Sequence, residues 1–138
     1  MTAFLDTNLL IYAQSADQKG EIARQAILDG GTISVQVINE FSAVLRRKFR
    51  LEWREIAAAV ADVRAALDPV RPVGIDTWTA AVALAQQHRF SFYNSLILAS
   101  ALDAGCDTLL TEDLQAGRRI EGLVIVNPFA APAPRPSA

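Results

Sequence analysis

The stretch FLDTNLLIY at residues 4–12 passes from an apolar run, through a polar triplet that begins at Asp6, into a second apolar run. With Ala3, the first run is typical of a short buried strand, and the residues around Leu9–Ala13 are typical of a helix. Asp6 therefore stands where a strand ends. In open α/β sheets, ligands bind beyond the carboxyl ends of the strands. This stretch predicts both the fold class and one edge of a site.

The rest of the chain repeats this alternation of short apolar runs and longer helical patterns. Strands are expected over Thr32–Ser34, within Val70–Ile75, over Asp107–Leu110 and over Leu123–Val126. Helices are expected over Glu21–Leu28, Val35–Phe49, Trp53–Leu67 and Tyr93–Ala104, with another that Asp76 caps and that runs to His88. Strands separated by helices predict an α/β fold, here a three-layer α/β/α domain with a central parallel sheet. We expect this domain to span residues 1–129, followed by a Pro/Ala-rich tail over 130–138.

Composition excludes several classes of site. The 138 residues are 51% apolar, which is ample for the core of one domain. A net charge of −2 predicts no strong global attraction to nucleic acid, so any RNA contact must use a local basic patch. The single Cys106 excludes an internal disulfide, and the single His88 argues against a histidine metal site or a Ser-His triad.

The sequence is expected to belong to a cytoplasmic protein. It has no basic region followed by an apolar stretch at its start, so we expect no signal peptide. No uncharged apolar run reaches the roughly 18 residues of a membrane-spanning helix, so we expect no membrane association. A single cysteine also fits a reducing compartment.

Isolated acidic residues recur at the predicted ends of elements. Asp6 and Asp113 each come just after a strand, and Glu40 lies beside the apolar stripe of a helix. Asn94 occupies a similar position in the first turn of another helix. Hard cations such as Mg²⁺ and Mn²⁺ prefer carboxylate and water oxygens, and a bound cation can activate water and orient a phosphodiester. The set therefore indicates a divalent-metal nuclease that needs no protein nucleophile.

Each of these residues also has a purely structural explanation. Asp6 is compatible with a loop acid or a helix cap, and Glu40 with a solvated helix charge. Asp113 is a plausible N-cap of a short helix, and Asn94 is a good capping residue in its own right. Individually the positions are ambiguous, and their joint order along the chain carries the prediction.

That joint order resembles the PIN-domain family, and within it the VapC-type toxins of bacterial type II toxin–antitoxin systems. The resemblance covers residues 1–129 and rests on FLDTNLLIY (4–12), SVQVINEF (34–41), FYNSLILASA (92–101), DTLLTEDL (107–114) and VNPF (126–129). It implies a Mg²⁺- or Mn²⁺-dependent endoribonuclease that cleaves structured RNA, often tRNA. It also implies a homodimer and a cognate antitoxin whose C-terminal segment covers the cleft.

The resemblance also implies roles for individual residues. The family's acidic quartet, which holds the metal and carries catalysis, maps onto Asp6, Glu40, position 94 and Asp113. Thr111 matches the family's hydroxyl residue near the metal. Asn8 matches a polar residue that supports the first acid.

Position 94 departs from the family pattern, which has Asp where this chain has Asn94. An amide can offer one neutral oxygen to a metal, but it cannot offset the cation's charge. Substitutions among metal ligands and the residues that support them commonly reduce metal affinity or activity about 10–100-fold. Asn94 is either an inactivating substitution or a natural residue in a chain that tolerates it or has lost catalysis. We favour the first explanation because the other motifs are intact.

Two further groups of residues bear on RNA binding. A basic run at the end of the Glu40 helix could contact phosphate or simply complement the helix C-terminus; it consists of Arg46, Arg47, Lys48 and Arg50. Four aromatic residues are expected in the core or at a dimer contact; they are Trp53, Trp78, Phe90 and Phe92.

Two other functions remain open on the sequence. A phosphatase of the haloacid dehalogenase type also places an Asp after its first strand, but it needs a second Asp where this chain has Asn8. It also needs a lysine, and the chain has only Lys19 and Lys48. The non-enzymatic alternative is a catalytically dead module that retains RNA or antitoxin contacts while Asn94 disables catalysis.

Overall fold

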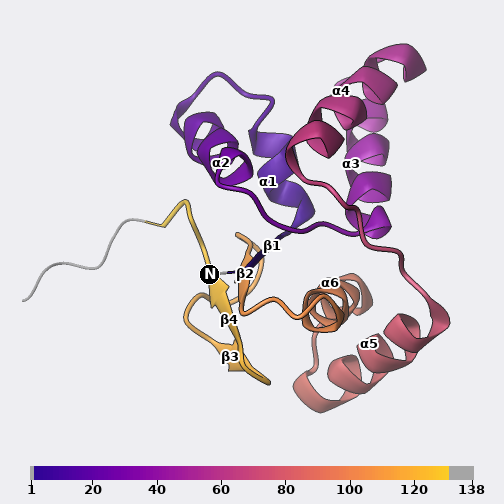
Figure 1. Ribbon diagram of the computed structural model, residues 1–138, viewed down its shortest axis with the longest axis vertical. Coiled ribbons are helices and arrows are strands. Elements are labelled where there is room, and N and C mark those ends of the chain that lie inside the picture. Colours follow the sequence, from indigo (N-terminus) through magenta and orange to yellow (C-terminus); the bar gives the residue numbers. More distant parts are fainter. Residues whose placement is uncertain (1, 131–138) are drawn as a thin grey trace, which may run out of the picture.

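A computed structural model describes residues 2–130, which form six helices and four strands (Figure 1). In chain order these are β1 (Ala3–Leu5), α1 (Thr7–Tyr12), α2 (Gln18–Leu28), α3 (Val35–Arg47), α4 (Trp53–Ala66), α5 (Ile75–His88), α6 (Phe92–Asp103), β2 (Thr108–Leu110), β3 (Arg119–Ile120) and β4 (Leu123–Val126). Apart from Ala130, the predicted tail lies outside the described residues.

The four strands form one sheet in the order β1-β2-β4-β3. The pairs β1–β2 and β2–β4 are parallel, and β3 is an antiparallel edge strand on β4. The register places Leu5 opposite Leu110 and Leu110 opposite Val126, so the carboxyl ends of the three parallel strands coincide. The predicted α/β fold with a largely parallel central sheet is confirmed, although the short strand β3 was not predicted.

Two predicted strands are wrong as strands. The segment at 32–34 makes only two isolated parallel bridges, from Thr32 to Phe4 and from Ser34 to Arg71. The second is the only bridge that Val70–Ile75 contributes among the described residues. The reason is local, because the side chain of Ser34 caps α3 by accepting the Val37 N–H at 3.4 Å. The backbone must therefore turn away from the sheet directly after the bridge.

The helices form two groups, α1 to α4 in one and α5 with α6 in the other (Figure 1). The middle of α6, from Ser95 to Ala101, is buried throughout, which its near-continuous run of small and apolar residues allows. In α3 the buried residues Val37, Phe41 and Leu45 recur every four positions, as one helix face requires. Each such side chain contributes roughly 1.5–3 kcal/mol when it is fully removed from water. Glu40 consequently lies at the edge of the buried stripe, half-buried.

Several predicted helix caps need correction. Ser91 caps α6, since its hydroxyl accepts the N–H of Asn94 at 3.2 Å, and Asn94 lies within the first turn. Helix α5 begins at Ile75 after Gly74, so Asp76 is inside the helix instead of capping it. No helix follows Asp113 in the described part of the chain. Asp6, in contrast, is the N-cap of α1.

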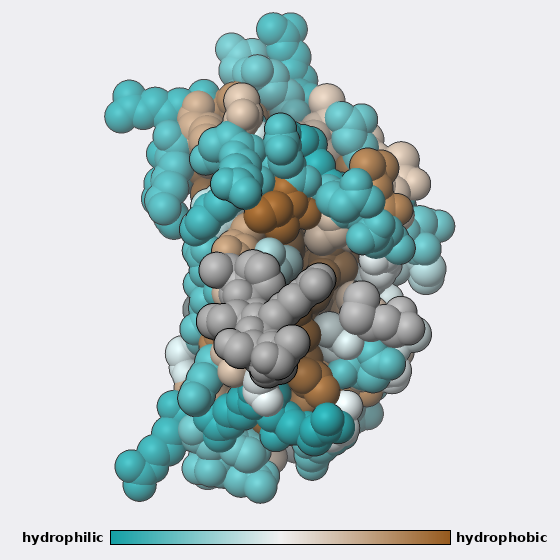
Figure 2. All heavy atoms as spheres, turned by 90° about the vertical axis from the view of Figure 1, so that its left-hand side faces the viewer, coloured by the Kyte–Doolittle hydropathy of each residue, from teal (hydrophilic) through white to brown (hydrophobic). Residues whose placement is uncertain are grey.

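The surface exposes more aromatic area than the sequence predicted. Trp53 is 63% exposed, Trp78 49% and Phe92 39%, so these three do not lie in the core, and for them a dimer contact stays a prediction. Phe90 is half-buried against the core. On the face seen in Figure 2, apolar side chains gather in a band between two hydrophilic regions. Within residues 2–130, no helix combines the length and the hydrophobicity that a membrane crossing needs.

The buried hydroxyl of Ser95 yields a test of the packing of α6. Its Oγ has no hydrogen-bond partner among the described residues, whereas the Oγ of Ser100 donates to the carbonyl of Leu96 at 2.8 Å. An unsatisfied buried hydroxyl costs about 1–3 kcal/mol, and Ala is also the better helix former. We expect Ser95→Ala to raise the free energy of unfolding by about 1 kcal/mol in urea denaturation. The matched variant Ser100→Ala should give no such gain, and equal effects of the two substitutions would contradict the assignment.

Candidate active site

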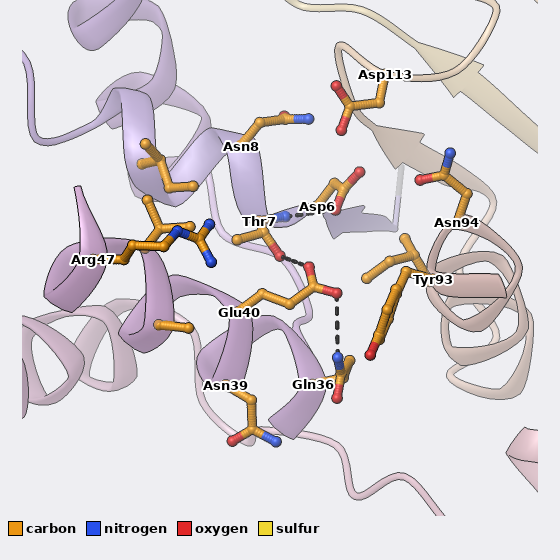
Figure 3. A pocket seen from close by; sticks show the side chains of 14 residues that line it. Asp6, Thr7, Asn8, Gln36, Asn39, Glu40, Arg47, Tyr93, Asn94 and Asp113 are labelled. Atoms are coloured by element: carbon orange, nitrogen blue, oxygen red, sulfur yellow. Dashed lines mark hydrogen bonds between the residues drawn. The ribbon is translucent and has the colours of Figure 1, made fainter. Parts of the chain in front are cut away.

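A pocket of about 540 Å³ opens between the two groups of helices, beyond the carboxyl ends of β1 and β2 (Figure 3). Residues of α1, α3 and α6 line it, together with Asp6 directly before α1 and Asp113 on the loop after β2. The lining consists of Asp6, Thr7, Asn8, Ile11, Gln36, Asn39, Glu40, Ala43, Val44, Arg47, Tyr93, Asn94, Ile97 and Asp113. The structure thus brings together Asp6, Asn8, Glu40, Asn94 and Asp113 from four separate parts of the chain.

Asp6 is the most buried acid of the pocket, with 4% of its surface exposed. Its backbone N–H donates to the carbonyl of Leu110 at 3.0 Å and so continues the β1–β2 ladder by one residue. One carboxylate oxygen accepts the N–H of Thr7 at 2.7 Å, and the other accepts the hydroxyl of Thr111 at 2.8 Å. The side chain is therefore fixed in orientation at the strand end.

Thr111 is fully buried and links three residues of the pocket. Its hydroxyl donates to Asp6, and it accepts the backbone N–H of Asp113 at 3.0 Å and the Nδ2 of Asn8 at 3.4 Å. One donor and two acceptor positions exhaust what a hydroxyl offers. Thr111 therefore sets Asp6, Asn8 and the start of the Asp113 loop relative to one another.

Glu40 is held by two donors that the sequence analysis missed. The hydroxyl of Thr7 donates to one carboxylate oxygen at 2.7 Å, and the Nε2 of Gln36 donates to the other at 3.2 Å (Figure 3). Gln36 lies four residues before Glu40 in α3, the spacing at which helical side chains meet, so this contact was readable from the sequence. The hydrogen bond from Thr7 to Glu40 joins α1 to α3, and no spacing in the sequence predicted it.

The electrostatics of the pocket act on Asp6. Its pKa is raised from 3.8 to about 6, chiefly because the carboxylate is buried, with smaller contributions from the negative charges of Asp113 and Glu40. The hydrogen bonds from Thr111 and Thr7 lower the pKa but do not offset burial. The pocket therefore concentrates negative charge around a carboxylate that ionises reluctantly, and a cation among these groups would relieve that cost.

Asp113 and Asn94 close the pocket from the side of β2 and α6. Asp113 is exposed on the loop after β2, and both side chains point toward the space in front of Asp6 (Figure 3). The loop is held from behind by Glu112, which accepts hydrogen bonds from Tyr12 and, at 2.6 Å, from the Nζ of Lys19. Neither Lys19 nor Lys48 lines the pocket, so the lysine that a phosphatase of the haloacid dehalogenase type needs is missing from it.

The basic run at the end of α3 divides into residues with different environments. Arg47 lines the pocket. The Nη1 of Arg46 donates to the carbonyl of Leu51 at 2.9 Å, and its guanidinium lies 4.9 Å from the ring centre of Trp53. Lys48 and Arg50 are exposed outside the pocket. Only one of the four predicted basic residues therefore reaches the acidic pocket.

The donor atoms of the pocket suit a hard divalent cation. They are carboxylate, amide and hydroxyl oxygens, and the Oδ1 of Asn8 is buried without a hydrogen-bond partner among the described residues. Within residues 2–130, no three His, Cys, Asp or Glu side chains already stand in a metal-holding arrangement. A cation would thus have to draw Asp113 or Glu40 closer to Asp6.

Comparison with known proteins identifies a family whose sequence pattern this chain matches. The sequence pattern of the PIN domain matches residues 3–121. A toxin–antitoxin complex from Klebsiella pneumoniae shares 25% identity at a TM-score of 0.70, covering 94% of this chain and 100% of the other.

Two further solved structures share the fold. The sarcin–ricin loop cleaving toxin VapC20 of Mycobacterium tuberculosis shares 19% identity at a TM-score of 0.64, over 78% of this chain and 87% of the other. VapBC2 from Rickettsia felis, bound to a DNA fragment from their promoter, shares 17% identity at a TM-score of 0.65, over 91% and 97%. A sequence comparison with curated proteins finds no match.

The raised pKa of Asp6 predicts how stability depends on pH. The pKa of Asp6 is about 6 in the folded protein and 3.8 in the unfolded chain. The folded state therefore binds the proton more tightly, which favours folding at low pH. This contribution to stability is lost as the pH rises through 6. The exposed Asp113 adds to the loss by repulsion. In EDTA, Asp113→Asn should therefore raise the free energy of unfolding at pH 7.5 by a few tenths to about 1 kcal/mol, with a smaller effect at pH 4.5.

Urea denaturation at both pH values measures this difference. Asp76→Asn, which removes an acid on α5 outside the pocket, is the matched control and should show no such pH dependence. A uniform destabilisation by Asp113→Asn at both pH values would contradict the electrostatic coupling.

Proposed function

This chain belongs to the PIN-domain family, and we propose that it is a metal-dependent endoribonuclease of the VapC toxin type. The observation that carries the proposal is the buried Asp6 at the end of β1, with Glu40, Asn94 and Asp113 around it in one pocket. The negative charges of Glu40 and Asp113 contribute to the raised pKa of Asp6, and a cation bound among these carboxylates would offset their repulsion. The sequence match and the 25% identity to a toxin–antitoxin complex support the same class.

Asp6, Glu40 and Asp113 would hold the Mg²⁺ or Mn²⁺ ion, with Asn94 as a weaker neutral ligand. When bound, such an ion lowers the pKa of a water and stabilises negative charge on phosphate oxygens. Thr111 keeps a carboxylate oxygen of Asp6 turned in a fixed direction by its 2.8 Å hydrogen bond. Asn8 acts through Thr111 and supports the same orientation.

The substrate we propose is a structured RNA, with tRNA as the first choice. A net charge of −2 gives the chain no general affinity for RNA, so the contact must be local. Arg47 is the basic residue at the pocket and would contact a phosphate beside the cleavage site. Arg46, Lys48 and Arg50 lie outside the pocket, so any contact that they make with RNA would be at a distance from the cleavage site.

Asn94 determines whether the proposed nuclease is active or catalytically impaired. Its side chain stands where it can face the cation, yet its amide carries no charge, so we propose that it weakens metal binding and impairs catalysis. The second candidate function follows from the same residue. A chain disarmed at one ligand would keep its RNA or antitoxin contacts and act as a binding module.

The proposed partners are a cognate antitoxin and a second copy of this chain. The Klebsiella pneumoniae relative was solved as a toxin–antitoxin complex, which supports an antitoxin. A basic antitoxin side chain in this acidic pocket would compete with the metal for the same carboxylates. A cytoplasmic location and a nuclease domain over residues 1–129 complete the proposal.

Restoring the acid at position 94 tests the proposed activity. We expect Asn94→Asp to bind Mg²⁺ about 10–100-fold more tightly and to cleave a total tRNA pool faster by a similar factor. Isothermal titration with Mg²⁺ measures the first effect without relying on activity, and gel analysis of the tRNA measures the second. Asp6→Ala in the Asn94→Asp background, and EDTA, are the inactive controls.

The outcomes separate the candidate functions. Cleavage only by Asn94→Asp supports a nuclease disarmed at one ligand, whereas cleavage by both forms means that three acids suffice. Equal Mg²⁺ affinities would contradict the role of position 94. Cleavage by neither form, in folded and antitoxin-free protein, would favour the binding module.

Arg47 yields a separate test of RNA contact. Arg47→Ala should weaken tRNA binding and reduce the slope of log Kd against log salt by about 0.7–0.9, the value for one lost phosphate contact. Lys48→Ala removes another exposed charge from the neighbouring position and is the matched control. If both substitutions change the slope equally, the pocket is not the site of phosphate contact.

A further inference from the structure

Tyr93 is an exposed aromatic residue outside the hydrophobic core. It lies in the first turn of α6, directly before Asn94, and 61% of its surface is exposed although it lines the pocket. Its ring meets the edge of Phe92 at 5.6 Å between ring centres, and Phe92 is itself 39% exposed. An exposed ring contributes little to the stability of the core, so its position invites a role at the surface of the pocket.

The wall around Tyr93 is suited to a flat, polar ligand. Gln36 and Asn39, both on α3, line the same pocket as Tyr93 (Figure 3). The Nε2 of Gln36 is used by Glu40, while the figure shows its amide oxygen directed away from that carboxylate. Amide side chains offer both donors and acceptors, as the edges of nucleobases do. Aromatic side chains stack on the faces of unpaired bases.

The charge of the pocket explains why such a contact is needed. Among the lining residues, the carboxylates of Asp6, Glu40 and Asp113 stand against the single guanidinium of Arg47. Three negative groups against one positive group repel phosphate, and a bound divalent ion brings the formal charge of the pocket only to zero, which leaves no net attraction for phosphate. A substrate held here therefore needs a contribution that does not depend on charge, and stacking on an aromatic ring is such a contribution.

We propose that Tyr93 forms a nucleobase subsite, in which an unpaired base next to the cleaved phosphate stacks on its ring and meets Gln36 and Asn39 at its edge. This inference rests on the proposed ribonuclease function and assigns a residue that selects the substrate. It also implies that the cleaved phosphate lies in a single-stranded loop, because a base must be unpaired to stack on the ring.

The test measures binding of fluorescein-labelled octaadenosine and of a ribose-phosphate octamer that lacks bases, to the full chain in Ca²⁺. Stacking is worth about 1–3 kcal/mol per base, so Tyr93→Ala should weaken binding of octaadenosine about 5–150-fold. Tyr93→Phe should retain most of the affinity, since it keeps the ring. Neither substitution should change the affinity for the base-free octamer or the slope of log Kd against log salt.

Trp78→Ala is the matched control, because Trp78 is 49% exposed on α5 and does not line the pocket. Equal binding of octaadenosine by Tyr93→Ala and the unchanged chain would overturn the subsite while leaving the ribonuclease proposal intact. A loss of affinity that is the same for both probes would also overturn it, since a structural defect acts on both. Failure of the unchanged chain to bind octaadenosine would also overturn the subsite, whereas the ribonuclease proposal is decided separately by tRNA cleavage with Asn94→Asp.

Discussion

The parallel pairing of β1 with β2 is the constraint on which the rest of the site depends. Leu5 stands opposite Leu110, and the Asp6 N–H continues the ladder by donating to the Leu110 carbonyl. The next residues of the two strands, Asp6 and Thr111, are therefore neighbours, and their side chains bond at 2.8 Å. A shift of one strand by one residue would turn its side chain to the other face and break the contact.

The pocket combines this rigid centre with an unfavourable charge distribution. Asp6 is buried, and burial together with Asp113 and Glu40 raises its pKa to about 6. Proteins keep such arrangements where the charge serves a ligand, since the same groups cost stability in isolation. Glu40 is held by hydrogen bonds from Thr7 and Gln36, whereas Asp113 stands on an exposed loop and has more room to move toward a cation. Asn94 reduces the negative charge that such a cation would meet.

Local patterns in the sequence determined much of this molecule. Apolar runs placed β1, β2 and β4, and helical periodicity placed the six helices to within a few residues. The acids at strand ends followed from the general rule that parallel strands present their carboxyl ends at one edge. Failures were local: Ser34 caps α3 and cuts short a predicted strand, while Ser91 takes the capping role that Asn94 could have filled. Competing caps of similar strength cannot be ranked from sequence alone.

Tertiary structure alone decided how the site is supported and which charges reach it. The bond from Thr7 to Glu40 spans two helices, and no spacing in the sequence encodes it. Arg46 and Arg47 are adjacent in the chain, yet Arg46 turns to Leu51 and Trp53 while Arg47 lines the pocket. Neighbouring residues on a helix point in directions about 100° apart, so the packing of α3 determines which one meets the acids. The sequence by itself thus determined the chemistry of the donors, and the packing of the helices determined which of them meet.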